Sequence, residues 1–254
     1  MLSNVAMRRR AFIENRLCGK KPRILEFGAF DNPTFRRELG DHVKYLDFFS
    51  GPELREMHKD NQNRDLDAIV DVDYVVKSNR FVDQIKERFD LLVANHVVEH
   101  IPDLIFWFQQ AQTLLTRGGI AFLAVPDRRY TFDYFRPLSL ATQMIRAHRD
   151  RLEKPDMWHL AEHFYYHQKV SLKELWDGNL PRKFEPRFSL AKALIMAEEK
   201  SGQYTDAHCW VFTADSFPQL IADLRSSGTV NLGLDGVKEP EPGTNEFWAI
   251  LSGH

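Results

Sequence analysis

Two carboxylates and one glycine in the first fifth of the chain have the spacing of a nucleoside site. Glu26 lies in the short apolar run of residues 23–27, and Gly28 ends that run. Asp47 ends a second run, residues 43–47, 19 positions after Gly28. In a strand–helix–strand unit, an acid about 20 residues after the glycine turn binds the ribose diol of a nucleoside. The pattern therefore predicts a nucleoside site at the carboxyl ends of two buried parallel strands.

Phe30 restricts the kind of nucleoside compound that this site can take. A dinucleotide site needs a second glycine in the turn, so that the backbone can contact the pyrophosphate. Phe30 occupies that position, and its ring closes the approach. We therefore expect an adenosine compound without phosphates, and S-adenosylmethionine (SAM) meets that description.

Later blocks of the chain, together with this first turn, resemble the class I SAM-dependent methyltransferases. The first turn resembles motif I, whose usual form is acid-x-Gly-x-Gly, and it departs from that form at Phe30. Residues 97–103, VVEHIPD, resemble the EH-(I/V)-P-D block that often follows the fourth strand, and a helix, RGG, a strand and VPD come next, as in the methyltransferase-11-like subgroup. The resemblance implies a SAM-dependent methyltransferase with cofactor contacts at Glu26, Phe27, Gly28, Ala29, Asp47, Phe48, Asp73, Tyr74, Asn95 and His96.

Asp73 and Tyr74 carry a specific implication of this resemblance. An acid near the exit of the third strand meets the adenine amino group in class I methyltransferases. The alternative is that Asp73 belongs to a solvated turn.

The elements that must position these residues alternate between helix and strand. We expect an amphipathic helix over residues 4–18, a helix from Asp103 to Leu115, and a helix from Thr213 to about Leu224. We expect strands at residues 23–27, 43–47, 68–74, 89–96, 120–127, 230–234 and 246–251. This order predicts an α/β fold: a Rossmann-like, mostly parallel sheet with an antiparallel last strand, in a single domain spanning residues 1–254.

Residues 128–207 interrupt that order after the fifth strand. The segment is rich in histidine, arginine and aromatic residues, and we expect it to be helical and irregular. Ligands bind beside the carboxyl edge of such sheets, so the segment is predicted to be a lid that binds the substrate. Arg128, Arg129, Tyr130 and Arg136 are the candidate acceptor-binding residues, and solvated surface arginines are the alternative.

The start of this segment also resembles bacterial methyltransferases associated with surface polysaccharides. The run that carries this resemblance is VPDRRYTFDYFRPL. It implies O-methylation of a sugar or glycan in polysaccharide biosynthesis, with a small molecule or a glycan as acceptor.

Transfer of a methyl group to a hydroxyl requires removal of the hydroxyl proton, and histidine can accept a proton near neutral pH. Ten histidines are present, and His208, His163 and His167 are the candidate bases. A structural role is the alternative for each of them. His96, Glu99 and His100 share one helix face and could hold a divalent metal. A loop that Glu99 and His100 orient without a metal is the favoured alternative.

The net charge, the apolar stretches and the cysteine count predict which partners and which compartment the protein has. With 34 basic and 36 acidic residues the net charge is -2, which predicts no nucleic-acid partner. No stretch is apolar enough for a signal peptide or a membrane span. The two cysteines predict a reduced, cytoplasmic protein. The oligomeric state stays open.

Two rival functions use the same sheet. The first is an NAD(P)-dependent oxidoreductase, against which Phe30 argues. The second is a catalytically silent SAM-binding partner protein, against which the intact pair of Glu26 and Asp47 argues.

Overall fold

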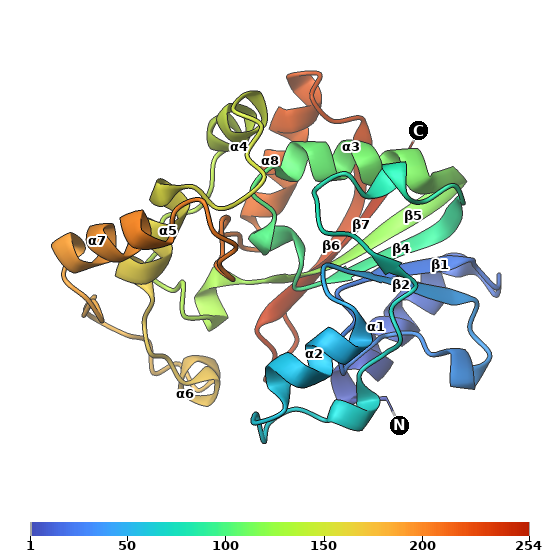
Figure 1. Cartoon of the computed structure of the whole chain (residues 1–254), viewed down its shortest axis with the longest axis horizontal. Helices are drawn as coiled ribbons and strands as arrows, with labels where there is room; N and C mark the ends of the chain where they lie inside the picture. The colour runs from blue at the N-terminus through green and yellow to red at the C-terminus, as the bar shows by residue number, and fades with distance from the viewer. Residues whose placement is uncertain (1, 254) are drawn as a thin grey trace. The chain divides into compact units, whose positions relative to one another are not determined.

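The structure is a computed structural model and describes residues 2–253. Seven strands form one sheet in the order β3-β2-β1-β4-β5-β7-β6 (Figure 1). The strands are β1 Ile24–Phe27, β2 Val43–Asp47, β3 Tyr74–Val75, β4 Phe89–Asn95, β5 Leu115–Pro126, β6 Leu232–Lys238 and β7 Glu246–Gly253. The sheet is mostly parallel with an antiparallel end, which confirms the predicted Rossmann-like fold.

Eight α-helices accompany the strands among the described residues. They are α1 Asn4–Leu17, α2 Gly51–His58, α3 Leu104–Leu114, α4 Ala141–Arg149, α5 Met157–Tyr166, α6 Leu172–Trp176, α7 Leu190–Lys200 and α8 Ser216–Ser226. Side chains cap several of these helices: the Ser3 hydroxyl accepts a hydrogen bond from Ala6 N, and Ser50 forms a capping box with Glu53. Within residues 2–253, no helix combines the length and the apolar character needed to cross a membrane.

The chain divides into two compact units. Unit 1 comprises Met1–Asn95, Gln110–Phe122 and Leu251–His254, and unit 2 comprises His96–Gln109 and Leu123–Ile250.

In unit 1, β1 lies between β2 and β4 and is parallel to both. Its four residues are all buried, as expected for a central strand of a parallel sheet. Phe27, at the end of β1, lies opposite Leu46 in β2 and Ala94 in β4. The three strands therefore end at the same edge, where Gly28, Asp47 and Asn95 are found.

The third strand is much shorter than predicted. A strand was expected over residues 68–74, but β3 contains only Tyr74–Val75, and a 3-10 helix, η2, spans Leu66–Ala68. The backbone N–H of Val70 donates to the carbonyl of Phe30 instead of to β2. Pairing with β2 therefore begins only at Tyr74, opposite Leu46.

In unit 2, the segment 128–207 forms a 3-10 helix, η5 Arg128–Tyr130, followed by α4, α5, α6 and α7. Helices α5 and α7 lie side by side (Figure 1). Leu160 and Ala161 from α5 are buried against Ala197 from α7. With Ala207 these residues form one buried apolar cluster, so the segment has an apolar core of its own.

Candidate functional site

Glu26 fixes the shape of the turn after β1. Its side chain is fully buried, and its carboxylate accepts hydrogen bonds from Thr34 N (2.7 Å), Phe35 N (3.1 Å) and Asn95 Nδ2 (3.1 Å). Burial raises the pKa of Glu26 to about 7, against the opposing effect of the Thr34 and Phe35 hydrogen bonds. Glu26 was predicted to contact the cofactor. Since it exposes no atom, we assign it instead to holding the loop that follows Gly28.

Gly28 and Phe30 both adopt left-handed backbone conformations in that loop. Gly28 has φ +57°, which costs glycine little, and its N–H donates to Leu46 O. Phe30 has φ +48°, and its ring lies 4.7 Å from the His58 ring and 4.9 Å from the Arg64 guanidinium carbon. The residue that replaces the second motif glycine is therefore anchored by contacts within unit 1.

Asp47 and Asn95 carry the polar atoms at this edge that suit a ligand. Asp47 is partly exposed at the end of β2, and its Oδ1 accepts a hydrogen bond from Phe49 N at 3.0 Å. Partial burial raises the pKa of the Asp47 carboxyl, although the bonds from Phe49 and Phe48 oppose this effect. The amide nitrogen of Asn95 is bound to Glu26 and Thr34, whereas its Oδ1 is buried without a hydrogen-bond donor. A buried acceptor left unpaired is an unusual feature that a ligand donor would satisfy.

Asp73 and Tyr74 do not reach the edge where the cofactor was predicted to contact them. Asp73 precedes β3, and its Oδ2 accepts a hydrogen bond from Tyr45 N at 2.7 Å and pairs with Arg37. The Tyr74 hydroxyl donates to Glu87 at 2.7 Å. Both side chains are held by unit 1 itself because the strand begins later than the sequence suggested. The predicted contacts of Asp73 and Tyr74 with adenine are therefore corrected.

His96 is the first residue of unit 2 and follows Asn95 directly. Its φ of +53° is unfavourable for a residue with a Cβ, and such strain concentrates at functional sites. Its Nε2 lies 2.7 Å from Glu246 Oε2 and its Nδ1 lies 3.4 Å from Glu99 Oε1. Burial alone would lower the pKa of His96, but these two carboxylates outweigh it and raise the pKa to about 9. His96 is not among the residues whose ligand atoms gather around Glu99, where the structure brings together Glu99, His100 and His208 instead of the predicted His96, Glu99 and His100.

A pocket of about 380 Å³ lies within unit 2. It combines aromatic and imidazole rings with amide and ammonium groups. Its lining residues are His96, Pro126, Tyr130, Thr131, Phe132, His167, Gln168, Lys169, Val170, Leu172, His208 and Asn245.

The structure brings the three predicted bases together around Phe132. The His167 ring stacks on Phe132 at 4.4 Å, and the His208 ring lies 4.6 Å from it. His163 accepts a hydrogen bond at Nδ1 from the backbone N–H of His208, and burial lowers its pKa to about 3. His163 is not among the residues that line the pocket, whereas His167 and His208 are. Of the three, these two can therefore meet a ligand in it.

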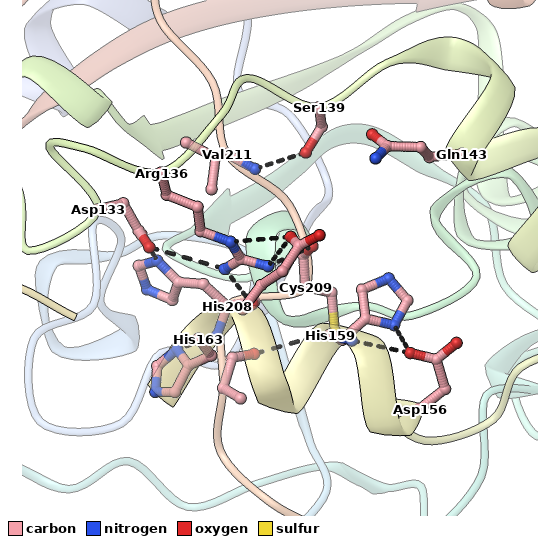
Figure 2. A network of polar contacts seen from close by, with 12 residues as sticks. Asp133, Arg136, Ser139, Gln143, Asp156, His159, His163, His208, Cys209 and Val211 are labelled. Atoms are coloured by element: carbon pink, nitrogen blue, oxygen red, sulfur yellow. Dashed lines mark hydrogen bonds and ion pairs between the residues drawn. The ribbon is translucent and has the colours of Figure 1, made fainter. Parts of the chain in front are cut away.

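His208 has a defined orientation. Its Nδ1 lies 2.5 Å from Oδ2 of Asp133, which is buried (Figure 2). Burial alone would raise the pKa of the Asp133 carboxyl, but the bond to His208 and the nearby charges lower it. The carboxylate fixes Nδ1 as the donor side of the ring, so Nε2 is the nitrogen left for a ligand.

Arg129 and Arg136, two of the three predicted acceptor-binding arginines, form ion pairs with acidic residues, and Arg136 also donates to buried backbone oxygens. Arg136 is 1% exposed, donates to the backbone oxygens of His208 (2.7 Å) and Cys209 (3.3 Å), and pairs with Glu162 (Figure 2). Arg129 is bound by Asp127 and Glu239. Their guanidinium groups are bound within the protein, so the structure favours a structural role for Arg129 and Arg136 over the predicted role in acceptor binding.

Arg128 and Tyr130 complete the predicted set. Arg128 donates to the backbone oxygen of Arg136 at 2.8 Å and is not among the lining residues, so it also has a structural role. Tyr130 does line the pocket, and its ring stacks on Trp176 at 4.2 Å. Tyr130 is therefore the member of the set that the structure places where an acceptor can bind.

Sequence reasoning missed Asp133, Glu246 and Asn245. Asp133 meets His208 across 75 positions of the chain, and Glu246 meets His96 across 150. No local spacing connects such pairs, because the fold alone brings them together.

Comparison with known proteins agrees with this geometry. A family model described as a methyltransferase domain matches residues 3–179, which is more than half of the chain, and the chain belongs to that family. No curated protein matches significantly. Among solved structures, the chain is similar to the CcbJ methyltransferase from Streptomyces caelestis (TM-score 0.49, 13% identity, 99% of this chain and 97% of that chain).

Two further structures show the same level of likeness. A SAM-dependent methyltransferase from Clostridium acetobutylicum has a TM-score of 0.49 and 9% identity over 97% of this chain and 92% of that chain. A protein described as a putative Zn-dependent alcohol dehydrogenase from Rhodobacter sphaeroides has a TM-score of 0.50 and 11% identity over 100% and 90%. At these identities the likeness concerns the fold alone.

The protein is a SAM-dependent methyltransferase, and SAM is its cofactor, as the sequence predicted. The residues at the edge of unit 1 fit this cofactor. Asp47 offers a carboxylate for a diol, and Asn95 offers an unpaired buried oxygen for a donor. When bound, SAM supplies an electrophilic methyl group.

Proposed function

We propose that the protein methylates a hydroxyl oxygen of a sugar or glycan, in the biosynthesis of a surface polysaccharide. The observation that carries the proposal is the unit 2 pocket, in which aromatic rings and hydrogen-bonding side chains line one cavity. The resemblance of the segment beginning at VPDRR to polysaccharide-associated methyltransferases agrees with it.

The composition of the pocket suits a carbohydrate. Tyr130 lines the pocket with an aromatic ring on which the C–H face of a sugar can stack, whereas the Phe132 ring is packed against His167 and His208. Gln168, Lys169 and Asn245 offer donors and acceptors for hydroxyl groups. A volume of about 380 Å³ lies at the lower end of the range for small-molecule sites, which fits one or two sugar rings.

In this proposal His167 takes the proton of the acceptor hydroxyl. The O–H bond breaks, its proton moves to the imidazole of His167, and the oxygen electron pair forms the new bond to the methyl carbon. The bond between that carbon and sulfur breaks, and S-adenosylhomocysteine leaves. Burial is the main cause that lowers the pKa of His167 below its usual value, so the ring is a neutral acceptor at pH 7.

Transfer of a labelled methyl group tests the proposal. Purified protein would be incubated with methyl-labelled SAM and with separate pools of sugar nucleotides, oligosaccharides, lipids and nucleic acids. We expect label in a carbohydrate pool, in an alkali-stable ether bond. Label confined to lipid, nucleic acid or a nitrogen atom would refute the proposed acceptor.

A binding measurement distinguishes the methyltransferase from an NAD(P)-dependent oxidoreductase, the rival function that uses the same kind of sheet. Titration with NADH and with SAM in parallel should show binding of SAM alone. Saturable NADH binding that SAM displaces would favour an oxidoreductase.

A further inference from the structure

Glu99 is a buried carboxylate whose oxygens have no hydrogen-bond donor. It lies in the 3-10 helix η4 Val98–His100, just after β4, and is 1% exposed. Neither of its side-chain oxygens accepts a hydrogen bond. The nearest cationic groups are His96 Nδ1 at 3.4 Å and His100 Nε2 at 3.7 Å. His96 forms an ion pair with this carboxylate, but both carboxylate oxygens still lack a hydrogen-bond donor, so either oxygen could bind a cation.

Two histidines complete a group of metal-binding atoms around this carboxylate. Glu99, His100 and His208 each offer one ligand atom, and these atoms lie within 4.8 Å of one another. The rings of His100 and His208 are 4.8 Å apart and nearly perpendicular, at 88°. All three residues belong to unit 2.

Each of the two imidazoles has a carboxylate near its Nδ1 atom. The Nδ1 of His208 lies 2.5 Å from Asp133 Oδ2, and the Nδ1 of His100 lies 2.9 Å from Asp206 Oδ1. The Asp133 carboxylate is hydrogen-bonded to Nδ1 of His208 and leaves Nε2 of that ring for a ligand, whereas Asp206 lies beside Nδ1 of His100 as an ion-pair partner without a hydrogen bond. A carboxylate on the far nitrogen fixes the tautomer and makes the near nitrogen more basic, and it commonly accompanies histidine ligands of metals.

The ligand set indicates the kind of ion. Two imidazoles and one carboxylate suit first-row transition metals such as Zn²⁺ or Mn²⁺ better than Mg²⁺ or Ca²⁺, which prefer oxygen ligands. Three protein ligands leave at least one coordination position for another molecule. His208 also lines the 380 Å³ pocket, so one of the three ligands lies at the proposed acceptor site.

We infer that Glu99, His100 and His208 bind a divalent transition-metal ion that also binds the acceptor hydroxyl. The role of the ion rests on the proposed function. Bound to the ion, the hydroxyl loses its proton to His167 more readily, while the oxidation state of the metal does not change. Metal binding itself depends on neither SAM nor the acceptor.

Calorimetric titration of untagged, chelator-treated protein with ZnCl₂ and with MnCl₂, without SAM, tests the inference. We expect one equivalent to bind. Asp206→Asn should weaken binding about 10- to 100-fold, because it removes an exposed outer partner and leaves the ligands intact. Glu99→Gln and His100→Gln should weaken binding more than Asp206→Asn does.

The matched control is His42→Gln, which changes an exposed histidine of unit 1 and should leave the affinity unchanged. Circular dichroism melts of each variant verify that it is folded. Absence of binding, or equal affinity in the wild type, Glu99→Gln and His100→Gln, would overturn the inference and leave His167 to act as the base without a metal. Failure to methylate any sugar would not affect this result, so the two proposals are tested separately.

Discussion

Asp47 is the residue whose role follows most directly from its position in the sheet. It ends β2 beside the Gly28 turn, and its carboxylate is partly exposed. Asp47→Asn removes the charge from the proposed bond to the ribose diol. We expect a loss of about 1.5–3 kcal/mol in SAM binding, measured by calorimetry. Asp71→Asn is the control, because Asp71 is 84% exposed. Equal SAM affinity in both variants would show that Asp47 does not hold the ribose.

Arg136 is expected to stabilise the protein, contrary to the role that its sequence context suggested. Arg136→Met leaves the backbone oxygens of His208 and Cys209 without their donor in a buried site and removes the cation that pairs with Asp133. Breaking a buried pair in this way costs about 3–5 kcal/mol. Urea unfolding should show this loss, whereas the exposed Arg149→Met should change stability by less than about 0.5 kcal/mol. A stable Arg136→Met with a raised Michaelis constant for the acceptor would restore the acceptor-binding role.

These two residues show what sequence could and could not supply at this scale. The position of Asp47 at the end of β2 was predictable because it depends on a short distance along the chain from Gly28, within one strand–helix–strand unit. The role of Arg136 depends on groups 26 to 73 positions away, which no local pattern connects to it. The sequence around an arginine in a loop does not show whether its side chain is solvated or buried.

At the scale of elements, the bounds of the central strands β1 and β4, which have continuous apolar runs, were predicted well, whereas those of the edge strand β3 were not. The central strands β1 and β4 have neighbours on both sides, so their apolar residues are buried and visible as a pattern. Strand β3 pairs only with β2, and the residues before it bind the Phe30 loop and Arg37. The alternating run at 68–74 therefore looked like a strand although most of it forms loop contacts. The predicted contacts of Asp73 and Tyr74 were wrong for the same reason.

Helix α5 carries the proposed base just after its last residue, Tyr166. Burial is the main cause that lowers the pKa of His167, and the nearby Asp133 charge opposes the shift. A base with a lowered pKa stays unprotonated as pH falls through 6.5. We therefore expect kcat/KM to be flat from pH 8 to about 6.5 and to fall only in more acidic buffer.

The variant His167→Gln separates this base from the other histidines. It should lower kcat/KM by about 10²- to 10⁴-fold and remove the acid limb of the pH profile. An acid limb that persists in His167→Gln would assign the titrating group to another residue.

At the scale of the whole molecule, the two candidate binding sites are built from different parts of the chain. The cofactor residues Asp47 and Asn95 belong to unit 1, and the lining of the acceptor pocket belongs to unit 2. Segment 128–207, predicted as the substrate segment, supplies eight of the twelve lining residues, from Tyr130 to Leu172. We therefore propose that cofactor affinity and acceptor affinity can be changed independently.

Tyr130→Ala tests this independence. The change removes a ring that stacks on Trp176 and offers a face to the sugar. Loss of one aromatic contact costs about 0.5–1.5 kcal/mol, so the Michaelis constant of the acceptor should rise up to about tenfold. The dissociation constant of SAM should not change. Tyr204→Ala, at a 55% exposed tyrosine of unit 2 outside the pocket lining, is the matched control and should change neither constant. If Tyr130→Ala weakened SAM and acceptor equally, Tyr130 would instead support the fold through Trp176, and the pocket would need another acceptor-binding residue.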